Sequence, residues 1–302
     1  MKLSVVGCTP VDEKEQFQYL KDCGFDAIDL SMGQYFDRNG KFGDIDNVTD
    51  EQIKEHFTML YECAKKADFE IGQTHSAFSG HPRNYDFDYD EIVKRQIASI
   101  KATHYLGSKY CVVHPIILPG RRYDLLKQEA FDKSVEFYKR LIPTLEEYDI
   151  YCCIENMWVC DPVYGHICST VLSHAQEMVD MCNVLGDRFR ICVDVGHAPL
   201  TQDDPCEMVR ICGDKLAVLH THDVDGISDL HTFPYSAHQA PHGIKPMRIN
   251  WEDFMKALDD VNYRGNLSFE ICPPGPIEIR RAGLIYLSEI GKHLVSLRSV
   301  KY

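Results

Sequence analysis

The sequence predicts an α/β protein folded as one (β/α)₈ barrel, a TIM barrel, with residues 1–302 in a single domain. Eight short apolar runs alternate with eight segments of helical periodicity along the whole chain, as expected when parallel strands are joined by helices. No linker or change in composition divides the 302 residues. Barrels of this type commonly reach about 250 residues as one unit.

The eight expected strands are short and rich in Val, Ile, Phe or Cys. Each is too apolar for a sheet with one face in water, which is typical of parallel strands covered by helices on the outside. The expected strands are Leu3–Cys8, Ala27–Ser31, Ile71–His75, Tyr110–His114, Tyr151–Glu155, Ile191–Asp194, Ala217–His222 and Leu267–Ile271.

Helices are expected between the strands, because apolar residues recur there with a helical period and glycine follows many of the segments as a C-cap. The expected helices are Glu13–Cys23, Asp50–Asp68, Asp88–Leu106, Leu125–Tyr148, Thr170–Leu185, Pro205–Cys212, Trp251–Val261 and Glu278–Ser296. The longest irregular stretches are Met32–Val48, Asn156–Ser169 and Asp223–Asn250. All three follow strands, so we expect them at the carboxyl-terminal mouth of the barrel, where such folds keep their active sites.

The net charge, the N-terminal residues and the cysteines predict which partners the protein binds and in which compartment it lies. The formal net charge is −14, opposite in sign to that of a typical nucleic-acid or membrane binder, so we expect neither partner. The first residues do not form a secretory signal and no run of 18 residues is apolar throughout, so we expect a cytoplasmic protein. The 13 cysteines lie scattered in apolar runs without a CxxC pair, which predicts buried free thiols.

Ionisable side chains stand at the carboxyl ends of strands three to eight, and a barrel brings these ends together around one pocket. Buried ionisable groups are costly unless they are paired or bind a metal, and adjacent carboxylates repel one another without a cation. We therefore expect a divalent metal site. The residues at the strand ends are His75, His114, Glu155, Asp194, His197, His220, His222, Asp223 and Glu270, and the loop after strand seven adds Asp229 and His231.

Five short motifs carry all of these residues except His75 and His114: IEN at 154–156, CVDVGHA at 192–198, HTHD at 220–223, SDLH at 228–231 and FEI at 269–271. In order and spacing the chain resembles the xylose-isomerase-like TIM-barrel superfamily, which includes sugar-phosphate isomerases and epimerases, ketose 3-epimerases, inosose dehydratases and endonuclease IV. The resemblance covers nearly the whole chain. It implies a metal bound by Glu155, Asp194, His220 and Glu270, with Asp229 and His231 as ligands of a further site.

Two features of this implied site stay open. His222 lies two residues after His220, on the same face of the strand, so either histidine could be the ligand, and we favour His220 for its spacing to Asp223. Three carboxylates and one imidazole favour Mn²⁺, with Mg²⁺, Co²⁺ or Zn²⁺ as alternatives.

The resemblance implies an isomerase or epimerase of keto-sugars or sugar phosphates that works through a metal-stabilised enediolate. Glu155 and Glu270 would take and return the proton, and His114 is a candidate base outside the metal ligands. The expected substrate-binding residues are His75, His197, His222, Trp158 and Arg248. The expected partners are a small sugar and identical subunits in an oligomer, with a small partner subunit as an alternative.

Three other functions stay open. A lyase with this fold and metal could eliminate a β group from a ketoinositol or a 3-keto C-glycoside, because the same enolate precedes either outcome. A barrel used only for binding should have lost one of the four metal ligands, and none is missing. A three-zinc nuclease like endonuclease IV is opposed by the acidic charge and by the lack of a basic cluster on the mouth loops, although all nine of its ligand positions are filled. Those positions are His75, His114, Glu155, Asp194, His197, His220, Asp229, His231 and Glu270.

Overall fold

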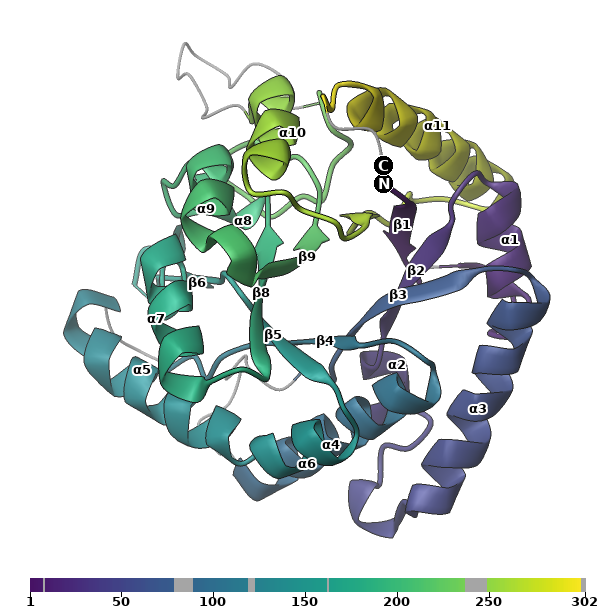
Figure 1. The fold of residues 1–302 in the computed structure, drawn as a ribbon, viewed down its shortest axis with the longest axis horizontal. Coiled ribbons are helices and arrows are strands. Elements are labelled where there is room, and N and C mark those ends of the chain that lie inside the picture. Colours follow the sequence, from purple (N-terminus) through teal and green to yellow (C-terminus); the bar gives the residue numbers. More distant parts are fainter. Residues whose placement is uncertain (8, 79–88, 119–122, 162, 237–248, 300–302) are drawn as a thin grey trace.

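The computed structural model describes residues 1–7, 9–78, 89–118, 123–161, 163–236 and 249–299, and it shows a ring of eight parallel strands surrounded by helices (Figure 1). The TIM-barrel fold expected from the sequence is thereby confirmed. The strands follow one another in the order β10-β1-β2-β3-β4-β5-β8-β9. Their bounds are β1 (Leu3–Val6), β2 (Ala27–Ser31), β3 (Glu70–His75), β4 (Tyr110–Val113), β5 (Tyr151–Glu155), β8 (Phe189–Asp194), β9 (Leu216–His220) and β10 (Leu267–Phe269).

The two end strands of this sheet also meet, which closes the ring. Thr221, directly after β9, forms a parallel bridge with Phe269 of β10. The Thr221 N–H donates to the carbonyl of Ser268 at 2.8 Å, and the Thr221 carbonyl accepts from the N–H of Glu270 at 3.2 Å. Closure gives the edges of the sheet a partner and brings the carboxyl ends of its strands to one mouth.

The barrel interior is layered. A buried apolar layer consists of Val112, Cys153, Cys192 and Val218, one from each of β4, β5, β8 and β9. Two positions after each of these four residues, at or directly after the end of its strand, stands an ionisable side chain. Because side chains along a strand alternate between its two faces, these also point inward, one layer nearer the mouth. They are His114, Glu155, Asp194 and His220.

The helices cover the outside of the ring (Figure 1). In chain order they are α1 (Gln16–Asp22), α2 (Gly33–Phe36), η1 (Ile45–Asn47), α3 (Asp50–Lys66), α4 (Tyr89–Tyr105), α5 (Tyr123–Lys139), α6 (Ile142–Glu147), α7 (Ala175–Leu185), α8 (His197–Leu200), α9 (Pro205–Cys212), η2 (Gly213–Lys215), α10 (Trp251–Asp260) and α11 (Ile277–Ser296). Gly186 follows α7 with a φ of 93°, a left-handed conformation that glycine adopts without strain. Of the helices described, none is both long and apolar enough to cross a bilayer.

The single helix expected over Leu125–Tyr148 is instead two helices, α5 and α6, separated at Arg140 and Leu141. Pro143 explains the break. Proline lacks the N–H that would bond to the carbonyl four residues earlier, and its ring clashes with that carbonyl in a continuous helix.

The stretch after β5, expected to be irregular, contains a short antiparallel hairpin of β6 (Trp158–Cys160) and β7 (Ile167–Ser169). Its turn is held by the side chain of Asp161, which accepts from the N–H groups of Val163 and Tyr164 at 2.8 and 2.7 Å. Gly165 completes the turn with a φ of 72°. The expectation was wrong here because it overlooked aspartate and glycine as turn-forming residues.

One cysteine also departs from the expected free thiols. Eleven of the described cysteines are free, whereas Cys272, two residues after Glu270, is disulfide-bonded. Disulfide pairing requires two Cα atoms within about 7 Å of each other and Cβ atoms that point toward one another. Spacing in the sequence does not reveal such proximity when strand ends converge.

Candidate metal centre

Four side chains from β5, β8, β9 and the end of β10 meet at the centre of the mouth, and we call them the central cluster: Glu155, Asp194, His220 and Glu270. Each offers one ligand atom, and these atoms all lie within 4.8 Å of one another. His220 Nδ1 is 2.7 Å from Glu155 Oε1 and 3.3 Å from Glu270 Oε2. All but Glu270 are fully buried. The structure thus brings together the four residues that the resemblance implies as ligands of one metal.

His75 and His114 extend this cluster toward β3 and β4. His114 Nε2 lies 2.8 Å from Glu155 Oε2, and His75 Nε2 lies 3.5 Å from the same oxygen. The two Nε2 atoms are 3.0 Å apart. Glu155 therefore stands between two sets of groups, with Oε1 toward His220 and Oε2 toward this histidine pair.

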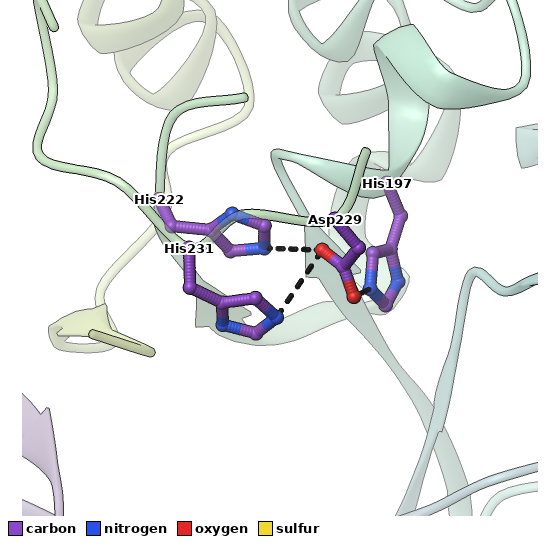
Figure 2. Close-up of side chains that lie close together, drawn as sticks. All are labelled: His197, His222, Asp229 and His231. Carbon is purple, nitrogen blue, oxygen red and sulfur yellow. Dashed lines mark ion pairs between the residues drawn. The ribbon is translucent and has the colours of Figure 1, made fainter. Parts of the chain in front are cut away.

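A second group of possible ligands lies beside the first, and we call it the outer cluster: His197, His222, Asp229 and His231. Their ligand atoms also lie within 4.8 Å of one another. Figure 2 shows the Asp229 carboxylate between the three rings. Asp229 Oδ2 is 3.5 Å from His197 Nε2, and Asp229 Oδ1 is 3.2 Å from His231 Nε2.

The two histidines between which the sequence could not choose, His220 and His222, belong to different clusters in the structure. His222 Nε2 lies 3.1 Å from the Asp194 carboxylate and 3.9 Å from Asp229 Oδ1. Its ring stacks on that of His231, with centroids 3.9 Å apart and planes 4° from parallel. Of the two histidines, His220 therefore lies in the central cluster, whereas His222 joins the Asp194 carboxylate to the other residues of the outer cluster.

Three of the histidines are anchored to the backbone in the same manner. In each, Nδ1 donates to a main-chain carbonyl, which leaves Nε2 to face the site. The pairs are His75 with Ser76 at 3.1 Å, His197 with Asn156 at 2.8 Å and His231 with Glu270 at 2.6 Å. Such outer bonds fix the tautomer and ring orientation of a metal-binding histidine.

The carboxylates of the central cluster differ in their affinity for a proton. Burial by itself raises the pKa of Glu155, but the neighbouring His220 and His114 hold it well below its usual value. At Asp194 burial is likewise outweighed, by His197 and His222, and the pKa falls to about 2. At Glu270 burial prevails and raises the pKa. Glu155 and Asp194 are therefore ionised at neutral pH, and Glu270 takes up a proton more readily than either.

The histidines also differ in charge. Burial lowers the pKa of His114 to about 4, against the pull of Glu155. Burial opposes protonation of His197 and His231 too, but the charge of Asp194 raises the pKa of His197 to about 10, and the hydrogen bond to Asp229 raises that of His231 to about 9. Before any cation binds, the outer cluster is thus held together by ion pairs.

Two remaining sequence predictions concern the mouth loops. Trp158, at the start of the hairpin, donates its indole N–H to Asp229 Oδ2 at 3.3 Å, and its ring meets that of His197 edge-on with centroids 6.3 Å apart. Trp158 therefore borders the outer cluster. Arg248, the other expected substrate contact from a loop, lies outside the described residues.

Sequence reasoning missed one buried carboxylate below the central cluster. Asp29, in the middle of β2, accepts from His220 Nε2 at 2.9 Å and from Gln73 Nε2 at 2.9 Å. Its only signal in the sequence is a charged residue inside the apolar run Ala27–Ser31.

The donor set fits a divalent cation. Among the described residues, Glu155 Oε2 and Asp229 Oδ1 are buried carboxylate oxygens that lie close to histidine nitrogens without a well-aligned hydrogen bond. Buried polar atoms in native proteins are normally satisfied by a partner, a water or an ion. Carboxylate oxygens and imidazole nitrogens are the ligands that Mn²⁺ and similar cations prefer.

Residues 17–289 match the family described as the xylose isomerase-like TIM barrel. The chain belongs to this family. A relative of the xylose isomerase-like chain, the uncharacterized protein y4fM of Sinorhizobium fredii, is 24% identical over 147 residues. The matched stretch is 46% of this chain and 42% of that protein, so the chain aligns with less than half the length of this relative.

Solved structures share the xylose isomerase-like fold over almost their whole length. A D-tagatose 3-epimerase-like protein superposes with a TM-score of 0.71 at 19% identity, covering 98% of each chain. The IolI protein with a bound zinc atom has a TM-score of 0.68 at 16% identity, over 99% of this chain and all of that one. The probable 3-DHS dehydratase AsbF of Bacillus anthracis has a TM-score of 0.65 at 14% identity, over 95% and 99% of the two chains. At these identities the likeness concerns the fold.

Proposed function

We propose that the protein is a divalent-metal-dependent isomerase or epimerase that acts on a keto-sugar, free or phosphorylated. The observation that carries the proposal is the central cluster, where three carboxylates and one imidazole offer ligand atoms within 4.8 Å of one another at the barrel mouth. The ligands would be Glu155, Asp194, His220 and Glu270. This donor set favours Mn²⁺, with Mg²⁺, Co²⁺ and Zn²⁺ as alternatives.

A bound divalent cation would polarise a substrate carbonyl and make the adjacent C–H acidic. Glu155 ends β5 and Glu270 follows β10, which is three strands away around the closed ring, so the two carboxylates approach the substrate from different sides. One takes the proton from carbon and the other returns one. Return to the opposite face of the same carbon gives an epimer, and return to the neighbouring carbon gives an isomer. His114, 2.8 Å from Glu155, is the candidate base outside the metal ligands.

The substrate hydroxyls would lie against the histidines around the central cluster. His75, His197 and His222 each have a ring nitrogen facing the site that can donate or accept a hydrogen bond. Trp158 would border the bound sugar on the hairpin side. Among similar structures are a D-tagatose 3-epimerase-like protein, a D-psicose 3-epimerase and an L-ribulose 3-epimerase, which supports enolisation of a keto-sugar as the class of reaction.

The test has two stages, metal content first and proton exchange second. We expect about one Mn, Co or Mg ion per chain in protein purified without chelator, measured by elemental analysis. The metal-loaded protein should then exchange the proton next to the carbonyl of a keto-sugar in D₂O, followed by NMR across a panel of free and phosphorylated sugars. Glu289→Gln, which changes an exposed carboxylate on α11, is the matched control for variants of Glu155 and Glu270. A protein that binds no metal even after soaking would overturn the proposal.

A lyase is the second candidate, and the outer cluster is the observation that favours it. His197 and His231 of this cluster have raised pKa values and could protonate a departing β group. An epimerase needs no such acid, because it only returns a proton to carbon. A ketoinositol would then lose water, or a 3-keto C-glycoside would lose its aglycone, the latter with a small partner subunit as an alternative requirement of the assay. Ultraviolet absorbance from an unsaturated ketone product, without formation of an epimer, would establish the lyase reaction.

A three-zinc nuclease is the third candidate, because its nine expected positions lie in the central cluster, the adjoining histidine pair and the outer cluster. About three zinc ions per chain and cleavage of DNA at abasic sites would establish it, against the net charge of −14. We propose in addition that identical subunits assemble into an oligomer, which light scattering of the purified protein measures directly.

A further inference from the structure

A carboxylate that belongs to neither cluster lies directly beneath His220. Asp29 is 1% exposed and sits in the middle of β2, across the barrel from β9. Its Oδ2 accepts the Nε2–H of His220 at 2.9 Å, while the other ring nitrogen, Nδ1, faces Glu155 Oε1 at 2.7 Å. The imidazole therefore spans the gap between Asp29 below and the central cluster above.

We propose that Asp29 is a positioning residue for the metal site: it holds the proton of His220 on Nε2 and so presents the Nδ1 lone pair to the cation. The inference rests on the proposed function insofar as it takes the central cluster as the metal site. A metal-binding imidazole has one nitrogen for the metal and one N–H for a second partner, and that partner sets the tautomer and raises the basicity of the ligand.

The other histidines of the mouth make the role of Asp29 specific. His75, His197 and His231 rest their outer nitrogen on a neutral main-chain carbonyl and direct Nε2 at the site. His220 has the reverse orientation, with Nδ1 directed at the site, and its outer partner is a carboxylate. A charged acceptor binds an N–H more strongly than a neutral one does, so His220 has the strongest outer anchor of these four histidines.

Asp29 is itself held in place by a neighbour from the next strand. Gln73 donates from Nε2 to Asp29 Oδ2 at 2.9 Å and to the carbonyl of Leu219 at 3.2 Å, so one amide ties the carboxylate to the strand that carries His220. Asp29 Oδ1 has no hydrogen-bond donor among the described residues. A carboxylate that only joins strands would be expected to bond main-chain N–H groups, as Asp26 does with Leu3 N at 2.9 Å.

The first test compares metal affinity in two variants of matched charge. Asp29→Asn removes the charge beneath His220 and leaves the Nε2–H only a neutral amide oxygen as its acceptor, which binds an N–H less strongly than a carboxylate does. Asp26→Asn removes the same charge from an exposed position directly before β2. Titration with Mn²⁺ against a fluorescent chelator should give affinity about 10- to 100-fold weaker for Asp29→Asn and unchanged for Asp26→Asn. Equal affinity in the two folded variants would overturn the role of Asp29.

The second test measures the protein with Asp29 in place and does not depend on whether Asp29→Asn folds. In protein labelled with ¹⁵N-histidine and loaded with ¹¹³Cd²⁺, the His220 ring should show cadmium coupling at Nδ1 and a proton on Nε2, with the signal assigned by its loss in His220→Gln. Coupling at Nε2 would overturn the inference and leave the proposed function standing. Failure of the unaltered protein to bind any cation would overturn both.

Discussion

Adding one methyl group at Gly196 tests the packing of the outer cluster. Gly196 precedes α8 with φ of −78° and ψ of −30°, a conformation that alanine adopts without strain. On backbone grounds, Gly196→Ala should therefore stabilise the protein by about 0.4–1 kcal/mol. The new Cβ, however, would lie 2.7 Å from His222 Nε2 and closer still to Nδ1 and Cε1 of the same ring. Contacts between such atoms are favourable only near 3.5–4.0 Å.

The His222 ring has little freedom to yield. It is fully buried, its Nε2 faces the Asp194 carboxylate at 3.1 Å, and one face stacks on His231 at 3.9 Å. Overpacking costs about 1–3 kcal/mol, and loss of the bond to a charged partner adds about 1–3 kcal/mol. We expect a net destabilisation of about 2–4 kcal/mol, which for a chain of this size lowers Tm by about 3–6 °C.

A double-mutant cycle checks this reasoning by differential scanning calorimetry. In the background of His222→Ala the obstacle is absent, so Gly196→Ala should change stability by less than about 0.5 kcal/mol or increase it. The clash would then account for the whole effect. The same loss of stability in both backgrounds would refute the explanation, and so would an increase in the wild-type background.

Three further outcomes follow from the site and its surroundings. Glu270→Gln should lower turnover at least 100-fold while preserving Tm, since general acid–base groups contribute about 10²–10⁴ in rate; a rate above a tenth of the wild type would contradict its role. In the metal-free protein, Asp229→Asn should lower the pKa of His231 from about 9 toward 6.5 in an NMR titration, and an unchanged value would contradict the ion pair. Glu91, bonded to Arg38 and Arg95, has its pKa lowered to about 2, so Glu91→Gln should cost about 1–2 kcal/mol at pH 7. The loss of stability should shrink as pH falls from about 4.5 to 2, because the wild-type carboxylate then takes up a proton. A loss of stability that does not change with pH would contradict the role of the ionised Glu91 carboxylate.

Much of the fold could be predicted because each strand carries its own signal. The runs Ala27–Ser31 and Tyr151–Glu155 coincide with β2 and β5 to the residue, since a covered parallel strand is apolar along its whole length. Local signals also existed for two of the features that were predicted wrongly. Pro143 marks the break between α5 and α6, and the Asp161 turn marks the hairpin, but helical periodicity and loop length were given more weight than these single residues.

Some residues of the site could be placed from the sequence, whereas others could be placed only from the structure. Glu155, Asp194 and Glu270 could be placed at the mouth because each ends or follows a strand whose direction is fixed by the fold. Asp29 could not be placed, because its partner His220 is 191 positions away and the contact depends on how β2 and β9 face each other across the barrel. The alternation of side chains along β2 indicates only that one face of the strand points into the barrel. It does not indicate at which depth in the barrel the Asp29 side chain lies.

The loop after β9 shows how the two clusters are joined. Asp223 and Thr232 pair in an antiparallel bridge with N–H to carbonyl distances of 2.8 and 2.9 Å, which turns the loop back over the mouth and brings Asp229 to His197. His231 holds a left-handed backbone, with a φ of 45°, which costs a residue with a side chain about 1 kcal/mol or more. Its ring is fixed at both nitrogens, by the Glu270 carbonyl at 2.6 Å and by Asp229 at 3.2 Å. Glu270 therefore directs its carboxylate into the central cluster and its carbonyl to His231 of the outer cluster, so this one residue contacts both clusters.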